Sequence, residues 1–373
     1  MADFFFYGTL RHVPLLQLVL GRAQGALTVS AATLADHGVF RLGDEPFPHF
    51  ASVPGAVATG ILLHDVSEDE ANRLRFYEGG FAYRLREVSV RAETGDMVPA
   101  LVFYPDTVDQ ATERAWSLPD WERDWAEISL CAAAEAMAWY GRKSAEEMTL
   151  AFPGMRRRAS ALVAGRKRQA DPDRDLSRDV RVAAHHHPYT KFFSMQEIDV
   201  QVRQYDGGMS DVLNRAAILV GEAAVVLPYD PRRDCVLLIE QFRAPVFMTG
   251  DPAPWVWEPV AGLLEPGEPP EVAARREALE EAGLAFGRLE PVGGMYSSTG
   301  SSTEYLHLFV GLADLAGNVT GTGGTDEGED IRSKVISYDA LMQGIDAGAY
   351  KDMPLVTTAL WLARHRGRLR GTA

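Results

Sequence analysis

The sequence predicts a mixed α+β protein with more than one domain. Its 373 residues exceed what a single core usually organises, because domains typically hold about 100–200 residues. The first hundred residues read as short strands separated by turns, and strand patterns return from Tyr189 onward. Between these parts, residues 107–163 carry apolar residues three and four apart, which is typical of helices. Strands that surround single helices favour an α+β fold.

The first strands follow one another in a simple order. DFFFYGTL is an apolar strand that runs into a glycine turn, and alternating segments follow at 26–42 and 55–66. Residues 86–104 predict a hairpin with its turn at 94–96. Helical pattern is sparse here, chiefly at 14–20 and 67–77.

The middle of the chain predicts helices and then a linker. Ser117 is placed to cap a helix that has Pro119 in its first turn. A core-facing stripe follows at helical spacing, formed by Trp121, Trp125, Ile128 and Leu130. Residues 165–190 are charged, Pro-interrupted and poor in large apolar residues, so we interpret them as a linker. The histidines at 185–187 could ligate a metal, but a solvated segment is the simpler interpretation.

Charge and composition narrow the class of protein. Lys+Arg 37 against Asp+Glu 52 leaves a net charge of −15, which argues against nucleic acid as a partner because phosphate backbones are held mainly by Lys and Arg. Two distant cysteines exclude a disulfide framework and favour a reducing compartment. No apolar run spans a bilayer, and the N-terminus does not resemble a secretory signal. We therefore expect a cytoplasmic enzyme with no membrane partner.

Residues 262–284, GLLEPGEPPEVAARREALEEAGL, carry the strongest chemical signal. Pro269-Pro270 supports a helix start and Gly283 a helix stop. The helix between them places the carboxylates of Glu277, Glu280 and Glu281 on one face, where like charges repel unless a cation lies among them. Mg²⁺ takes such oxygen ligands. The alternative is an acidic, solvated helix face.

The spacing resembles the Nudix box, Gly-x5-Glu-x7-Arg-Glu-U-x-Glu-Glu-x-Gly-U. The fixed positions of that box are matched by Gly262, Glu268, Arg276, Glu277, Glu280, Glu281 and Gly283. From about Lys191 to the C-terminus, the chain is similar to the ADP-ribose pyrophosphatase branch of the Nudix hydrolases. The resemblance implies a Nudix α/β/α fold, a Mg²⁺ cofactor with Mn²⁺ as the alternative, and hydrolysis of ADP-ribose to AMP and ribose 5-phosphate.

The same resemblance implies the metal and catalytic residues. The metal ligands would be the carbonyl of Ala261 and the carboxylates of Glu277, Glu281 and Glu329. Glu327 would be the base that orients the attacking water, and Glu280 would hold a further ion or its water. A degenerate Nudix domain that only senses nucleotide is the rival class, but the complete glutamate set argues against it.

The substrate contacts implied by the resemblance are Arg215, Arg243 and Glu304. Arg243 could form a bidentate phosphate grip that lysine cannot make. Where this branch usually has a Ser-Pro-Gly turn, the chain has Ser298-Thr299-Gly300. Other nucleoside diphosphate sugars therefore stay open as substrates beside ADP-ribose.

The N-terminal part, about residues 1–107, resembles the γ-glutamylcyclotransferase family, a small β-barrel with helices. The carrying segments are FFFYGTLRH and GILLHDVSEDEANRLRFYEGGFAYRLREVSV. The amides of Tyr7, Gly8, Thr9 and Leu10 would hold a carboxylate, and Glu78 would shuttle a proton during cyclisation. The alternative is a barrel kept as a scaffold, with Glu78 paired to Arg84 or Arg75.

We therefore expect three parts. They are a γ-glutamylcyclotransferase-like domain at 1–107, a helical connector and charged linker at 108–188, and a Nudix domain at 189–373. The fusion resembles bacterial tellurite-resistance proteins, a phenotype label without a mechanism. The Nudix resemblance also implies a homodimer, with strands 192–205 exchanged between two subunits.

Overall fold

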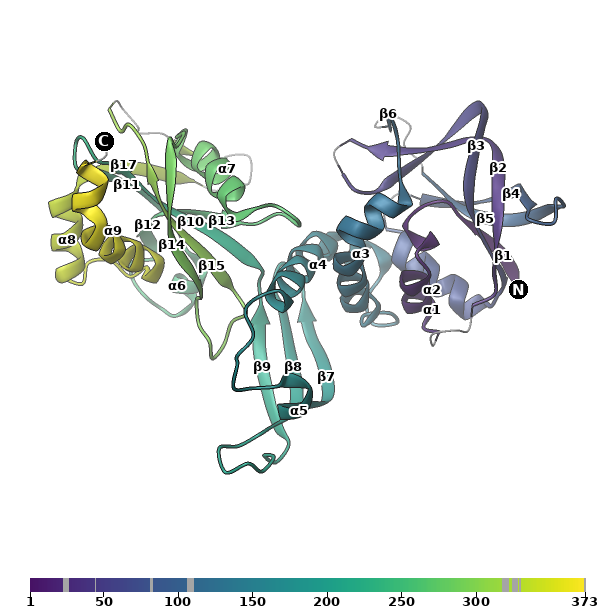
Figure 1. Cartoon of the computed structure of the whole chain (residues 1–373), viewed down its shortest axis with the longest axis horizontal. Helices are drawn as coiled ribbons and strands as arrows, with labels where there is room; N and C mark the ends of the chain where they lie inside the picture. Colours follow the sequence, from purple (N-terminus) through teal and green to yellow (C-terminus); the bar gives the residue numbers. More distant parts are fainter. Residues whose placement is uncertain are drawn as a thin grey trace. The chain divides into compact units, whose positions relative to one another are not determined.

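The computed structural model folds into two compact units, residues 1–214 and 215–373 (Figure 1). It describes residues 1–22, 27–43, 45–80, 83–105, 111–316, 322–323, 328 and 330–371. No helix in these ranges has both the length and the apolar composition needed to cross a membrane.

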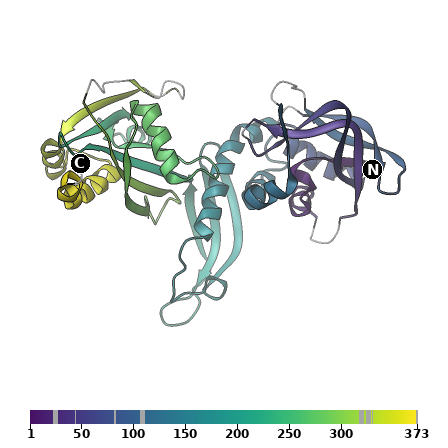
Figure 2. The same cartoon turned by 45° about the horizontal axis from the view of Figure 1, so that its top comes forward.

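The first unit is built on a closed barrel, as its resemblance to the γ-glutamylcyclotransferase family implied. The sheet order β3-β1-β5-β4-β2-β6 is closed by a further pairing of β2 with β3. Both cartoon views show helices α1 (Val13–Leu20), α2 (Glu68–Glu78) and α3 (Leu118–Met137) beside the barrel (Figure 2). Its elements are β1 (Ala2–Phe6), the 3₁₀ helix η1 (Thr9–Arg11), α1 (Val13–Leu20), β2 (Val29–Leu42), β3 (Pro48–Val66), α2 (Glu68–Glu78), β4 (Tyr83–Ala92), β5 (Met97–Pro105), β6 (Ala111–Ala115), α3 (Leu118–Met137), α4 (Ala145–Arg166), α5 (Leu176–Asp179), β7 (Val180–Thr190) and β8 (Ser194–Val202). Strand β9 (Leu213–Leu219) carries the chain across the boundary.

Local signals account for the short helices and the hairpin. Ser67 caps α2 in a capping box, in which its hydroxyl accepts from the Glu70 amide while Glu70 accepts from the Ser67 amide. Ser117 caps α3 as predicted. The turn between β4 and β5 contains Gly95 at φ 94°, a left-handed conformation that favours glycine.

Two hydrophobic clusters fill the barrel and the space under its helices. Phe5, Tyr7 and Phe50 belong to the barrel interior, whereas Phe4 and Phe6 face the helices. The alternation along β1 therefore separates the two sides of this strand. On the helical side, Trp121 and Ile128 of the predicted stripe are buried, while Trp125 and Leu130 are half-buried.

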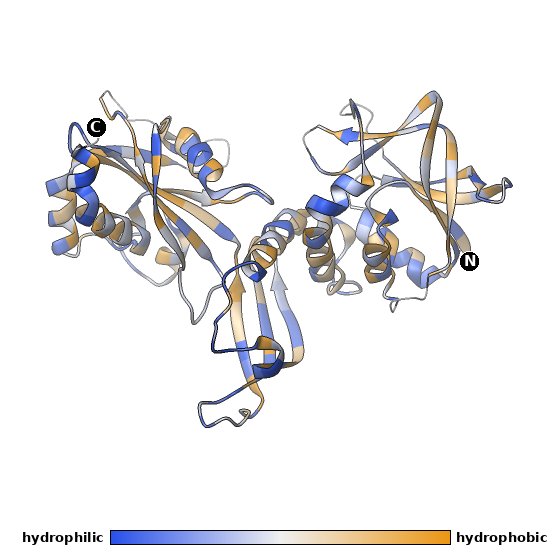
Figure 3. Ribbon diagram, in the orientation of Figure 1, coloured by the Kyte–Doolittle hydropathy of each residue, from blue (hydrophilic) through white to orange (hydrophobic). Residues whose placement is uncertain are grey.

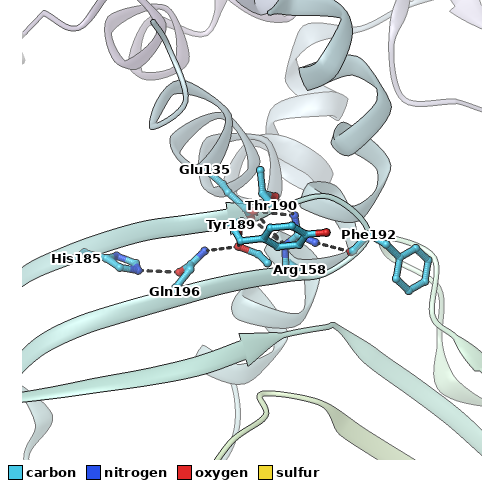
Figure 4. A network of polar contacts seen from close by, with 8 residues as sticks. Glu135, Arg158, His185, Tyr189, Thr190, Phe192 and Gln196 are labelled. Carbon is cyan, nitrogen blue, oxygen red and sulfur yellow. Dashed lines mark hydrogen bonds and ion pairs between the residues drawn. The ribbon is translucent and has the colours of Figure 1, made fainter. Parts of the chain in front are cut away.

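The linker interpretation of 165–190 was wrong over residues 180–190, which form β7 and pair antiparallel with β8. A buried polar network holds this hairpin against α3 and α4 (Figure 4). The Arg158 guanidinium donates to Glu135 at 2.7–3.1 Å and to the carbonyl of Phe192 at 2.9 Å, and Thr190 donates to Glu135 at 3.2 Å. The sequence of β7 did not indicate a strand because it contains few large apolar residues. Most of β7 is exposed, and a strand with a solvated face needs few apolar side chains.

The second unit is a mixed sheet between helices. The sheet order is β14-β15-β10-β11-β17-β16, with β12 paired to β11 and β13 to β10. Strands β10 and β15 are parallel. The elements are β10 (Glu222–Asp230), β11 (Cys235–Phe242), α6 (Ala244–Met248), β12 (Trp255–Glu258), β13 (Val260–Leu263), α7 (Pro270–Ala282), β14 (Arg288–Tyr296), β15 (Tyr305–Leu312), β16 (Thr322–Gly323), β17 (Ile331–Ser337), α8 (Tyr338–Asp346) and α9 (Met353–Gly371).

The central strands are buried on both faces, as expected where helices cover both sides of a sheet. Leu237 and Ile239 of β11 pack in the cluster that contains α7. Val236 and Leu238, one residue out of step, pack with α8 and α9. The result is the predicted α/β/α arrangement, in which α7 covers one face of the sheet and α8 and α9 the other (Figure 1).

Candidate functional site

Helix α7 positions the predicted acidic residues. Pro270 is its first residue, and Gly283 ends it at φ 62°. The amides of Gly283 and Leu284 return to the carbonyls of Leu279 and Ala278 at 3.0 and 2.9 Å. The apolar face of the helix consists of small residues with no solvent exposure, namely Ala273, Ala274 and Ala278. Small side chains let the helix lie close to the sheet, so its carboxylates come near the strand backbone.

Arg276 holds the loop and helix together. Its guanidinium donates to both carboxylate oxygens of Glu268 at 2.9 and 3.0 Å, to Glu277 at 2.7 Å and to Glu280 at 3.1 Å. Burial alone would raise the pKa of Glu268, but the hydrogen bonds and charge of Arg276, together with the Glu265 amide, hold that pKa below its usual value. Glu268 therefore returns over the helix to Arg276, and this pair joins the loop before α7 to the helix.

Two carboxylates of α7 meet the backbone of β13. The Ala261 amide donates to Glu281 at 3.2 Å, and Glu281 is buried. Gly262 leaves the space that Glu277 occupies, because a Cβ at this glycine would lie 2.0 Å from the Glu277 carboxylate carbon. Glu277, Glu281 and the Ala261 carbonyl therefore fit a hard divalent cation, which prefers oxygen ligands. Glu280 is more exposed, with 53% of its side chain accessible, so it lies toward the outer edge of this group.

The remaining predicted ligand and the base, Glu329 and Glu327, lie outside the described residues. Over the part of the chain that is described, no group of three acidic, histidine or cysteine side chains gathers closely enough to hold a metal ion. Among the described residues, the predicted metal site therefore consists of the carboxylates of Glu277 and Glu281 beside strand β13.

Glu78 is the last residue of α2 and lies among tyrosines. Burial raises the pKa of Glu78 to about 7. Burial and the nearby charge of Glu78 also raise the pKa values of Tyr77 and Tyr83. The Tyr7 hydroxyl donates to the Phe103 carbonyl at 3.0 Å. Glu78 itself has no hydrogen-bond or ion-pair partner among the described residues, and Arg75 instead binds Glu68 and Asn72.

The predicted carboxylate cradle lies where β1 runs into η1. Gly8 packs on Pro48, whose Cγ would lie 2.7 Å from an added Cβ. Within the described ranges, no group accepts a hydrogen bond from the amides of Gly8, Thr9 or Leu10, as is usual at the start of a helix. A cavity of about 20 Å³ lies beside Thr9 and is lined in part by residues of α3 and α4. This volume holds about one water molecule, so this cavity is too small for a γ-glutamyl group unless side chains move.

Comparisons with known proteins support the family resemblance of each half of the chain. Residues 220–355 match the NUDIX domain, and residues 4–123 match the gamma-glutamyl cyclotransferase, AIG2-like family. The ADP-ribose pyrophosphatase of Escherichia coli K12 is 39% identical over 193 residues, which are 52% of this chain and 91% of that protein. The chain belongs to the Nudix family.

Two further relatives match the same half of the chain. The ADP-ribose pyrophosphatase of Haemophilus influenzae is 31% identical over 207 residues, covering 55% of this chain and 95% of that protein. The GDP-mannose pyrophosphatase of Cronobacter sakazakii is 31% identical over 169 residues, covering 44% and 85%. Membership identifies an enzyme of the Nudix pyrophosphohydrolase class, in the branch of the ADP-ribose pyrophosphatases.

The predicted substrate contacts of the Nudix unit lie in three places. Arg243 follows β11, and its guanidinium makes a bidentate pair with Glu258 at 2.6–3.0 Å. Glu304 immediately precedes β15 and is half-buried. Arg215 is an exposed residue of β9. Thr299 is exposed in a turn that closes when the Ser302 amide donates to the Ser298 carbonyl at 3.1 Å, so this turn forms without the usual proline.

The sequence analysis missed two acidic residues near Arg243. Glu258 is buried at the end of β12, and a glutamate inside the apolar strand WVWE already demands a cationic partner. Asp352 immediately precedes α9. Burial and the charges of Glu258 and Glu304 raise its pKa to about 6, although the hydrogen bond from the Leu355 amide and the charge of Arg243 act in the opposite direction. The pattern Asp-Met-Pro could have indicated a helix cap but not its neighbours, which come from distant segments.

Proposed function

We propose that this Nudix enzyme hydrolyses the diphosphate of ADP-ribose to AMP and ribose 5-phosphate, with Mg²⁺ as cofactor and Mn²⁺ as the alternative. The observation that carries the proposal is the junction of α7 with β13, where Gly262 leaves room for the Glu277 carboxylate and Ala261 binds Glu281. This junction gives oxygen ligands a fixed geometry, and Arg243 lies in the same unit.

The residues divide the work by their chemistry. Glu277, Glu281, Glu329 and the Ala261 carbonyl would hold the metal, which when bound neutralises phosphate charge and lowers the pKa of its water. Glu327 would accept a proton from the attacking water, and Glu280 would orient water or a further ion at the outer edge. The water oxygen bonds to one phosphorus as the bond from that phosphorus to the bridging oxygen breaks. Arg243 and Arg215 would bind phosphate, and Glu304 the remainder of the nucleotide sugar.

Other nucleoside diphosphate sugars are the alternative substrates. The exposed Thr299 turn lacks the proline that rigidifies it in this branch, and one relative is a GDP-mannose pyrophosphatase. We expect a small nucleotide sugar rather than nucleic acid or a membrane as the partner, since acidic residues outnumber basic ones by 52 to 37. Cytoplasmic location and a link to tellurite resistance stay predictions.

The first test removes one charge from the proposed metal site. Glu281→Gln and Glu277→Gln should each lower turnover of ADP-ribose by about a hundredfold or more, because the ion loses a fixed ligand, while the melting temperature changes little. Glu271→Gln is the matched control, as an exposed glutamate in the first turn of the same helix. Turnover near that of the unmodified chain in both variants would remove the metal assignment. Activity without added metal would contradict the cofactor.

A second activity is proposed for the first unit, cyclisation of γ-glutamyl compounds. The observation that favours it is Glu78, whose pKa of about 7 suits a proton shuttle at neutral pH and which has no arginine partner among the described residues. The amides of Gly8, Thr9 and Leu10 would receive the substrate carboxylate, beside Tyr7. Incubation of the full chain with γ-glutamyl amines should release 5-oxoproline, and Glu78→Gln should stop this. If the unmodified chain releases none, the barrel is a scaffold.

A further inference from the structure

A chain of hydrogen bonds joins three polar side chains at one end of the barrel in the first unit. Asp3 lies near the start of β1, Ser30 near the start of β2 and His64 near the end of β3. The His64 ring separates the other two, since its Nδ1 lies 2.9 Å from the Asp3 carboxylate and its Nε2 lies 2.9 Å from the Ser30 hydroxyl. Hydroxyl, imidazole and carboxylate thus stand in the order that activates a serine in enzymes of several unrelated folds.

The two contacts of His64 define where its proton lies. An ionised carboxylate only accepts hydrogen bonds, so Nδ1 donates to Asp3. In the neutral imidazole, Nε2 then carries the lone pair, and the Ser30 hydroxyl donates to it. Because this nitrogen already accepts the hydroxyl hydrogen bond, it can take the proton when the serine oxygen attacks.

A bulge in the sheet aims His64 at Asp3. The register of β1 on β3 shifts between Ala2 and Phe4, so that β3 carries one residue more than β1 at this point. Asp65 has a left-handed φ of 56°, and its amide donates to the other oxygen of Asp3 at 3.1 Å. Both oxygens of the orienting carboxylate are therefore fixed. Bulges re-aim side chains in this way and are frequent beside active sites.

The group lies on the inner side of the strands and still reaches solvent. Each of its three residues is two positions from a residue of the barrel interior, namely Phe5, Ala32 or Leu62, and alternate residues of a strand share a face. The side chains of His64 and Asp3 are 33% and 23% accessible. The mouths of β-barrels are common places for small molecules to bind. The Gly8 turn, where the cyclotransferase cradle is predicted, follows the opposite end of β1.

Other histidines of the described ranges lack this combination. His12 contacts Glu122 at 2.8 Å, and His186 contacts Asp199 at 3.1 Å. In neither case, over the described residues, does a hydroxyl contact the second ring nitrogen. A polar cluster that only solvates the strand ends needs no hydroxyl there, whereas a nucleophilic site does.

We propose that Ser30 is an acyl-accepting nucleophile for small esters, with His64 as its general base and Asp3 as the residue that positions the ring. The serine oxygen bonds to the ester carbonyl carbon, and the bond from that carbon to the alcohol oxygen breaks. The hydroxyl proton passes to Nε2 of His64 and from there to the departing alcohol. Water then attacks the acyl group by the same route, which releases the acid and restores the serine. This chemistry uses neither the glutamates of α7 nor Glu78.

The test labels the nucleophile in the full chain. A fluorophosphonate probe phosphonylates activated serines, and mass spectrometry of peptides locates the label. We expect the label on Ser30 and its loss in Ser30→Ala. His64→Gln keeps a polar side chain without the base, and should slow both labelling and hydrolysis of p-nitrophenyl acetate about a hundredfold or more. Ser89→Ala is the matched control, because Ser89 is an exposed serine of β4 in the same barrel, and it should label like the unmodified chain.

A spectroscopic readout separates positioning by Asp3 from a merely structural role. An imidazole N–H that donates to a carboxylate gives a low-field proton resonance, which should disappear in His64→Gln and move upfield in Asp3→Asn. Asp3→Asn should also slow labelling at least tenfold while the melting temperature stays within a few degrees. The absence of label on Ser30, or labelling of His64→Gln at the rate of the unmodified chain, would overturn the proposal. Neither result bears on the hydrolysis of nucleotide sugars.

Discussion

At the scale of single residues, the pKa of a glutamate shifts down or up according to whether an arginine lies beside it. Glu70 accepts from Arg22 and the Ser67 backbone, which hold its pKa at about 2 although burial opposes them. The pKa of Glu268 is lowered in the same way by Arg276. Glu78 has burial without a cation, and its pKa rises to about 7. The sequence shows only that each is a glutamate, and the partner decides its charge.

The raised pKa of Glu78 predicts how the stability of the first unit depends on pH. Because the folded pKa of about 7 lies above the ordinary 4.5, folding favours the protonated acid. The stabilising effect is complete below pH 4.5 and is lost as the pH rises through 7. Glu78→Gln, which is neutral at every pH, should therefore stabilise the chain more at pH 8 than at pH 5, by on the order of 2 kcal/mol.

Thermal melting at the two pH values checks this difference. Glu87→Gln is the matched control, because Glu87 is an exposed residue of β4 in the same unit. The control should show the same small change in melting temperature at both pH values. An equal effect of Glu78→Gln at pH 5 and pH 8 would mean that the carboxyl is solvated, and the proton-shuttle role would lose its support.

At the scale of elements, local patterns predicted well and long-range pairs did not. Helix α7 was predicted because proline, glutamate spacing and glycine all lie within one short segment. The helix predicted at 67–77 and the turn predicted at 94–96 also formed, and the capping box at Ser67 and the glycine at 95 that support them are local in the same sense. Strand β7 was missed, because what holds it is a partner strand and the network of Arg158 and Glu135, which no local pattern encodes.

The candidate site shows the same difference between local patterns, which were predictable, and long-range contacts, which were not. The glutamates of α7 were predictable from their spacing, and so was Gly262. The close approach of Glu277 to Gly262, the hold of Glu258 on Arg243, and the place of Asp352 depend on how the sheet brings distant segments together. A carboxylate next to a guanidinium in space can be a hundred residues away in sequence.

The packing of α7 on β13 predicts a sensitive glycine. Gly262→Ala would place a methyl 2.0 Å from the carbon of the Glu277 carboxylate, so that carboxylate must move. We expect turnover to fall at least tenfold, since displacement of about 1 Å near the reacting groups costs that much or more. Because the carboxylate is the end of a flexible side chain, the melting temperature should fall by only a few degrees.

Gly367→Ala is the matched control for this prediction. Gly367 lies in α9, and a methyl there meets no atom within 4 Å. This variant should keep full activity and gain about 0.5–1 kcal/mol from helix propensity. Full activity of Gly262→Ala would show that Glu277 does not need its position against β13, and would count against its role as a metal ligand.

At the scale of the whole molecule, each unit has a core of its own. The clusters around Phe4 and Phe5 lie in residues 1–214, and those around α7 and α9 lie in residues 215–373. A variant in one core should therefore leave the packing of the other intact, since the clusters of the two units share no residues. The hairpin of β7 and β8 differs from these cores, because several of its large apolar side chains are exposed to solvent.

The exposed apolar residues of that hairpin predict a second copy of the chain as their cover. Phe192 is 61% exposed, and Tyr189 and Met195, opposite each other in the register, are 49% and 42% exposed. Figure 3 shows apolar and polar segments mixed along the strands of this hairpin. Contiguous apolar surface of this kind marks an interaction site. We expect a two-fold homodimer in light scattering at micromolar concentration. Tyr189→Ser with Met195→Ser should weaken dimerisation at least tenfold and lower hydrolysis with it, because the Nudix resemblance implies that both subunits build each site.

Leu150→Ser, on α4 and 86% exposed, is the control that should leave the dimer intact. A fully active monomer would contradict the exchange of strands 192–205, and the hairpin would then need another partner.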